Sequence, residues 1–105
     1  MAIAAMIKRK VKQGYQAKQL VPFILQLRAL ATFQPGYISG ETLCNLEQPE
    51  EWMVRSNWES IDHWKKWLNS KERAKIQEKI EAITGETTEY NIYEAMVVRS
   101  NSYKV

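Results

Sequence analysis

At 105 residues, of which 45% are hydrophobic and 26% charged, the chain can bury the core of one domain, which we expect to span 1–105. The net charge of +3 is mild, and its one basic concentration, at 8–12, alternates with a strand period, which indicates a solvated strand face rather than a nucleic-acid interface. No run approaches the roughly 18 apolar residues of a membrane span, and the short apolar stretch at 1–7 precedes its basic residues, which is the reverse of a signal peptide. We therefore expect a soluble cytoplasmic protein that contacts neither nucleic acid nor a membrane.

The first strand is predicted at 3–11, with Ile7, Arg9 and Val11 on one face and lysines on the other. A helix with one apolar stripe follows over 15–33. Because Pro22 is tolerated in a first helical turn, this helix either begins near residue 21 or is kinked there.

A hairpin comes next in the chain. Its first strand is predicted at 37–46, with the odd-numbered residues on one face, and its second at 52–58, with the even-numbered residues on one face. A second helix begins after Ser60, breaks at 68–70 and restarts behind a capping box of Asn69 and Glu72. Gly85 ends it, and a last strand is predicted at 87–99, followed by a short tail or strand extension.

The resulting order, β-α-β-β-α-β, predicts an α+β, ferredoxin-like fold: an antiparallel sheet with two helical segments on one face. Apolar residues remain on the other face of the sheet. We therefore expect a homodimer in which two copies pack through their open faces.

Catalytic groups are scarce. Cys44 is the only cysteine and His63 the only histidine, which excludes an intrachain disulfide and a two-histidine metal site. We expect no metal and no cofactor. The four tryptophans all fall between 52 and 67. They either form core or wall an apolar cavity for a flat aromatic ligand.

The strand end 55–58, the hinge Glu59-Ser60 and the helix 64–70 with Arg73 after it resemble the pattern of the antibiotic-biosynthesis monooxygenase superfamily. There, a strand tryptophan leads into a helix that bears a tryptophan and a serine. The resemblance covers nearly the whole chain and implies a dimeric α+β barrel around a pocket.

The same superfamily includes haem-degrading oxygenases that use an asparagine on the first strand, a helical tryptophan and a histidine ten residues later. Trp67 matches the tryptophan, but Ile7 and Gln77 stand at the other two positions. This departure argues against haem degradation by that route.

The resemblance therefore implies a cofactor-independent monooxygenase that oxidises a small aromatic or quinol substrate in a tryptophan-lined pocket. The residues that we assign to catalysis are Trp67, Asn57 and Arg55, and those that we assign to the pocket are Ile7, Arg9, Trp58, Trp64, Gln77 and Tyr93. A non-catalytic ligand-binding or stress-related dimer is the alternative, and a purely structural interaction dimer is a third possibility.

Overall fold

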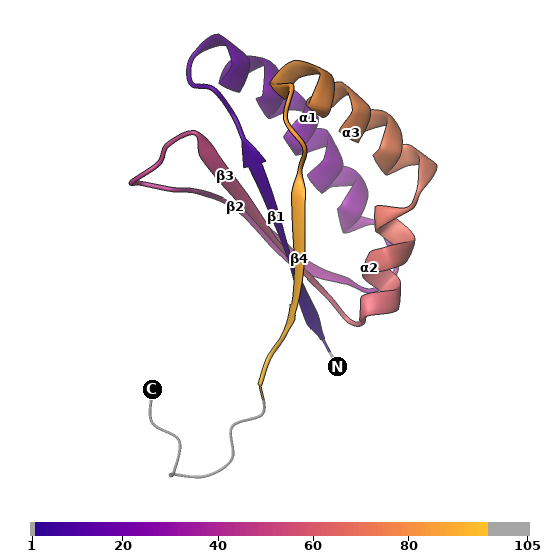
Figure 1. Cartoon of the computed structure of the whole chain (residues 1–105). Helices are drawn as coiled ribbons and strands as arrows, with labels where there is room; N and C mark the ends of the chain where they lie inside the picture. Colours follow the sequence, from indigo (N-terminus) through magenta and orange to yellow (C-terminus); the bar gives the residue numbers. More distant parts are fainter. Residues whose placement is uncertain (1, 97–105) are drawn as a thin grey trace, which may run out of the picture.

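A computed structural model describes residues 2–96 as an antiparallel sheet of order β2-β3-β1-β4, with every helix on the same side of it (Figure 1). This is the predicted ferredoxin-like α+β fold. The elements, in chain order, are β1 Ile3–Lys10, α1 Tyr15–Thr32, β2 Tyr37–Cys44, β3 Glu51–Trp58, α2 Ile61–Leu68, α3 Lys71–Thr84 and β4 Glu89–Glu94.

Strand β1 lies in the middle of the sheet, paired with β3 on one side and β4 on the other. Its side chains alternate as predicted: Ile3, Ala5, Ile7 and Arg9 are buried toward the helices, and the residues between them are half-buried on the open face. A residue period of two therefore sorts this strand into a helix-facing row and an open row.

The core between sheet and helices contains a row of aromatic rings. The ring centroids of Tyr37 and Trp58 lie 5.4 Å apart, those of Trp58 and Trp64 6.1 Å, and those of Trp64 and Tyr90 6.1 Å. The rings meet edge-on or tilted, which is the favourable geometry for aromatic pairs. Trp58 and Trp64 are fully buried in this row, which holds α2 against the sheet.

The predicted alternation of β2 is wrong at the start of the strand, where it placed Tyr37 on the same face as Ser39. The pairing of β2 with β3 shifts between Tyr37 and Ser39, so that Ile38 has no partner of its own. This bulge puts Gly40 and Thr42 on the face of Tyr37, opposite the helix-facing residues of β3, while Ser39 and the later odd-numbered residues share the other face as predicted. An inserted residue reverses the alternation, and nothing in the sequence pattern marks it.

Helix α1 settles the question that Pro22 left open. The helix is continuous from Tyr15 to Thr32 with Pro22 inside it, and Val21 and Pro22 are exposed. Because the proline lies on the solvent side, water can take the place of the backbone donor that it lacks.

The predicted break in the second helical segment is confirmed, and it separates α2 from α3. Ser60 caps α2 as predicted, accepting a hydrogen bond from the backbone of His63 at 3.2 Å. The cap of α3 is Ser70, one residue after the predicted Asn69, and it accepts from the backbone of Arg73 at 3.2 Å. Either residue type satisfies a free N–H at a helix start, so the pattern alone does not choose between neighbours.

Two further predictions concern the end of the chain. Gly85 ends α3 in the left-handed conformation, with φ at 69°, as predicted. Strand β4 is shorter than predicted, ending at Glu94, and the predicted positions 97–105 lie outside the described residues. Within residues 2–96, no helix is both long and apolar enough to cross a membrane.

Candidate functional site

A cavity of about 50 Å³ lies between α1, α2, α3 and the helix-facing side of the sheet. Its apolar walls come from four elements and its polar groups from β1, β3 and α3. The apolar side chains are Ile7, Ile24, Leu27, Val54 and Trp67, and the buried polar ones are Arg9, Ser56 and Arg73. Exposed Arg28 and Glu41 also border the cavity, so it reaches solvent between α1 and β2.

Arg9 is the most constrained polar residue of the cavity. Its side chain is only 4% exposed, and its Nη2 donates to Oε1 of Gln77 at 3.0 Å. The Nε–H of the same guanidinium is buried and has no hydrogen-bond acceptor within residues 2–96. Burial lowers the pKa of Arg9 from its ordinary value to about 10; the charge of Arg73 acts in the same direction, and Tyr90 and Glu81 oppose both. Arg9 therefore remains a cation at neutral pH, in a place where a cation is costly.

Gln77 orients Arg9. While its Oε1 accepts from Arg9, its Nε2 donates to Glu81 at 2.9 Å and to Thr88 at 2.8 Å. An amide that bonds on both sides has a fixed orientation, since flipping it would oppose donor to donor at Arg9. Arg9 is thus connected through Gln77 to the Glu81 carboxylate on α3 and to the Thr88 hydroxyl just before β4.

Arg73 supplies a second buried cation, also 4% exposed. Its Nη2 donates to the hydroxyl of Tyr90 at 2.6 Å, and its guanidinium lies 5.1 Å from the centroid of that ring. Stacking and a hydrogen bond on one tyrosine hold the planar group in place.

Ser56 forms the floor of the cavity on β3. Its Oγ accepts the indole N–H of Trp58 at 2.7 Å, and both residues are buried. This bond connects the cavity to the aromatic row of the core.

Of the residues predicted from the sequence, the structure brings four together. Ile7, Arg9 and Trp67 line the cavity, and Gln77 bonds to Arg9. Trp58 and Trp64 lie behind this group in the core and do not line the cavity.

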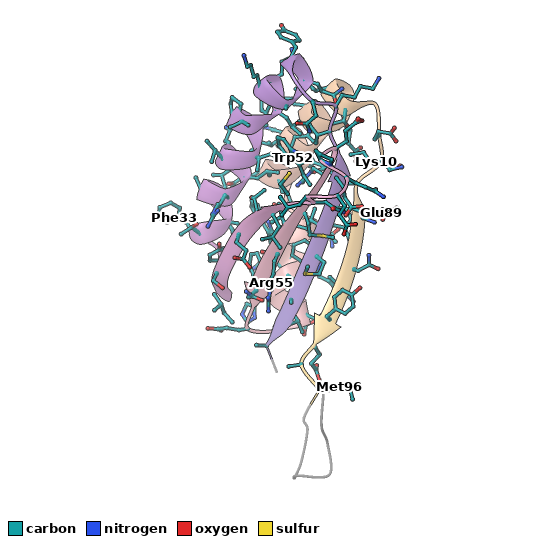
Figure 2. All side chains as sticks on the ribbon, turned by 90° about the vertical axis from the view of Figure 1, so that its left-hand side faces the viewer. Lys10, Phe33, Trp52, Arg55, Glu89 and Met96 are labelled. Atoms are coloured by element: carbon teal, nitrogen blue, oxygen red, sulfur yellow. The ribbon has the colours of Figure 1, made fainter. Side chains whose placement is uncertain are left out.

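Three other predicted residues lie on the opposite face of the sheet. Arg55 and Asn57 point away from the helices because they alternate with Ser56 and Trp58, and Tyr93 on β4 is 58% exposed on the same open face. Figure 2 looks onto this open face, where Arg55 is labelled. The structure therefore does not bring these three side chains to the cavity.

Two buried polar residues of the cavity, Arg73 and Ser56, were not among the predicted site residues. A signal for Arg73 exists: it precedes Ile76, Gln77 and Ile80 by three, four and seven residues, and those residues are all buried on α3. A charged residue on a buried stripe indicates a function. Ser56 could have been found by its place between Val54 and Trp58 on the buried row of β3.

The arrangement places the aromatic side chain of Trp67 and two buried guanidinium groups, those of Arg9 and Arg73, around one cavity. Among the residues that line the cavity, none is a buried histidine, aspartate or glutamate. Within residues 2–96, no three histidine, cysteine or acidic side chains gather closely enough to hold a metal ion. Gln77, at the position of the haem degraders' histidine, has both ends of its amide engaged.

The comparisons with known proteins agree with this fold. The family model described as antibiotic biosynthesis monooxygenase matches residues 2–79. Protein SchA of Streptomyces halstedii is 31% identical over 71 residues, which are 68% of this chain but only 18% of that protein. The chain thus spans less than a fifth of the length of this relative.

Two solved structures are similar over nearly their whole length. A conserved protein from Methanosarcina mazei Go1 aligns with a TM-score of 0.83 at 21% identity, over 91% of this chain and 94% of that one. SnoaB from Streptomyces nogalater, a cofactor-independent oxygenase, aligns with a TM-score of 0.78 at 15% identity, over 92% and 95%. At such identities the similarity shows a shared fold.

Proposed function

Because the chain belongs to the antibiotic biosynthesis monooxygenase family, we propose that it oxidises an electron-rich phenol or hydroquinone with O₂ and without a cofactor. The observation that carries the proposal is the cavity itself, where Trp67 and aliphatic side chains surround a buried cation, Arg9. The structurally similar SnoaB is a cofactor-independent oxygenase, which agrees with this chemistry.

In the proposed reaction the substrate supplies the electrons. A phenolate transfers one electron to O₂, and the phenoxyl radical and superoxide combine into a peroxide at a ring carbon. The peroxide takes up a proton and loses water, which leaves a quinone with one of the two oxygen atoms. The protein lowers the barrier by stabilising the phenolate electrostatically and by excluding water.

In this scheme Arg9 stabilises the anion and Trp67 holds the ring. Arg73 adds positive charge, and Gln77 keeps Arg9 in position. Since no buried carboxylate or histidine lines the cavity, the phenol loses its proton to solvent, which the positive charge favours by lowering the pKa of the bound phenol.

The test is oxygen uptake with a panel of single-ring hydroquinones, with ¹⁸O₂ to follow the label into the quinone. We expect one labelled atom per quinone and a fall of about tenfold in kcat/KM for Trp67→Phe, which loses ring contact without opening a large hole. Trp52→Phe is the matched control, because half-buried Trp52 borders a different surface groove, and it should react at the wild-type rate.

The absence of a buried base among the lining residues favours one alternative, a ligand-binding protein without turnover. Quenching of tryptophan fluorescence by a hydroquinone, with no oxygen uptake above the uncatalysed rate, would select this alternative.

We also propose that two copies pack through the open face of the sheet. That face presents half-buried Met6 and Met53 and the exposed ring of Tyr93 around a shallow hollow. Packing of a second sheet would cover these apolar side chains. Sedimentation equilibrium should give twice the chain mass, and Met6→Glu should give a monomer. A wild-type monomer at all concentrations would contradict the dimer.

A further inference from the structure

The cavity contains two buried positive charges that no ion pair within the described chain compensates. Arg9 and Arg73 are each 4% exposed, and within residues 2–96 neither forms an ion pair with an acidic side chain. Their hydrogen-bond partners are neutral, the amide of Gln77 and the hydroxyl of Tyr90. Glu81 attracts Arg9 only at a distance, across the bridging amide of Gln77. Two buried cations without a direct ion pair are rare, because little attraction to an opposite charge then offsets their desolvation.

The free donor of this pair is on Arg9. Its Nε–H is buried and has no acceptor within the described chain, while Nη2 of the same group is held by Gln77. A buried unsatisfied donor on a charged group is costly. An acceptor oxygen in the cavity would satisfy it, and a negatively charged oxygen would also neutralise the charge.

The size of the cavity limits the group to which that oxygen can be attached. The cavity has a volume of about 50 Å³, whereas a dry cavity of roughly 150 Å³ accommodates benzene. A single ring therefore needs extra room, which the exposed side chains at the mouth, Arg28 and Glu41, would have to provide by moving aside. A fused ring system needs still more room, so a cavity of this size favours a single ring.

We propose that this cavity binds a single-ring aromatic anion, its charged oxygen against the guanidinium groups of Arg9 and Arg73 and its ring against Trp67. The anion is a carboxylate or a phenolate, since each is a planar group that presents a negatively charged oxygen to the arginines. The inference rests on the proposed function, because it names the ligand class of the same cavity. Its test is binding, so that the two can fail separately.

The first arm of the test uses benzoate and benzamide, which have nearly the same shape and differ in charge. Isothermal titration at pH 7 should give a dissociation constant at least about tenfold lower for benzoate, the ratio expected when one charge-assisted hydrogen bond replaces a neutral one. In Arg9→Met this ratio should fall to about one. Lys10→Met removes the same charge from an exposed neighbouring position of β1 and should keep the wild-type ratio.

The second arm uses 4-nitrophenol, whose phenolate absorbs in the visible. Bound to the wild type, it should show phenolate absorption at a pH where the free phenol is neutral, and bound to Arg9→Met it should not. A response to benzoate alone identifies a carboxylate site, a response to nitrophenol alone identifies a phenolate site, and either one supports the inference.

Several results would overturn the inference. If benzamide bound as tightly as benzoate and no nitrophenolate signal appeared, the cavity would not select an anion. If folded Arg9→Met kept the wild-type ratio, Arg9 would not bind the charged oxygen. If 2-naphthoate bound more tightly than benzoate, the ligand would not be limited to one ring. Anion-selective binding without oxygen uptake would leave this inference standing while the proposed oxygenase fails. Oxygen uptake with neutral substrates and no charge preference would do the reverse.

Discussion

Replacing Arg9 with methionine separates the cost of its charge from the benefit of its packing. Methionine fills the space of the aliphatic stem without a cation. In the folded chain burial lowers the pKa of Arg9 to about 10, which corresponds to about 3 kcal/mol against the charged group. Against this gain, Oε1 of Gln77 loses the donor that lies 3.0 Å away, which costs about 1–3 kcal/mol. We expect the free energy of unfolding to stay unchanged or to rise by up to about 2 kcal/mol.

Urea unfolding at neutral pH, followed by far-UV circular dichroism, measures this difference without relying on tryptophan fluorescence. Lys10→Met removes a positive charge from an exposed position of the same strand and should change stability by less than about 0.5 kcal/mol. A loss of more than about 1 kcal/mol in Arg9→Met, with an unchanged m-value, would refute the reasoning, because Arg9 would then stabilise the fold without any ligand.

The pH dependence of the same pair of proteins provides an independent check. The pKa of Arg9 is lower in the folded chain than in the unfolded one, so between these values the unfolded chain binds more protons. Stability of the wild type, relative to Arg9→Met, must therefore rise with pH in that window. We expect a constant difference between about pH 6 and pH 9 and an increase in relative wild-type stability only above about pH 10. A difference that already changes near neutral pH would point to another group.

Two further substitutions test the packing around the cavity. Ser56→Ala leaves the buried indole N–H of Trp58 without its acceptor and should lower the free energy of unfolding by about 1–3 kcal/mol; a loss below about 0.5 kcal/mol would contradict this. Gly36→Ala, at φ 82°, would push a methyl group into the imidazole ring of His63, so we expect a loss greater than the roughly 1–2 kcal/mol of a left-handed residue alone. Gly14→Ala, at φ 81° with no atom within 4 Å, measures that backbone cost in the same thermal unfolding assay, and equal losses would show that His63 moves freely.

The sequence predicts those parts of the fold that follow from a residue period. The alternation of β1 placed Ile7 and Arg9 on one face, and the structure buries both toward the helices. The even-numbered residues of β3 likewise share the buried face. Regular alternation is reliable in strands whose two faces differ in environment, because a slip of one residue would bury the wrong set.

The parts of the fold that the sequence did not predict depend on single residues that interrupt the regular alternation of a strand. In β2 the unpaired Ile38 reverses the faces of every later residue, although the sequence there alternates as an ordinary strand would. At the site, the sequence did not assign each strand residue to the pocket face, so Asn57 and Arg55 were grouped with Trp67. In the structure, Arg55 and Asn57 lie on the open face of the sheet, whereas Trp67 lies on the side that the helices cover.

The break between α2 and α3 determines which residues can share the cavity. Trp67 and Arg73 are six residues apart, and in one uninterrupted helix the turn of about 100° per residue would put them on sides roughly 120° apart. The structure instead ends α2 at Leu68 and starts a new helix behind Ser70, so both side chains reach the same space. Each helix begins at its own serine cap, so neither relies on the other for the hydrogen bonds of its first turn. In protein engineering, grafting a different α3 onto this scaffold would thus change the charged corner of the cavity while the aromatic wall is kept.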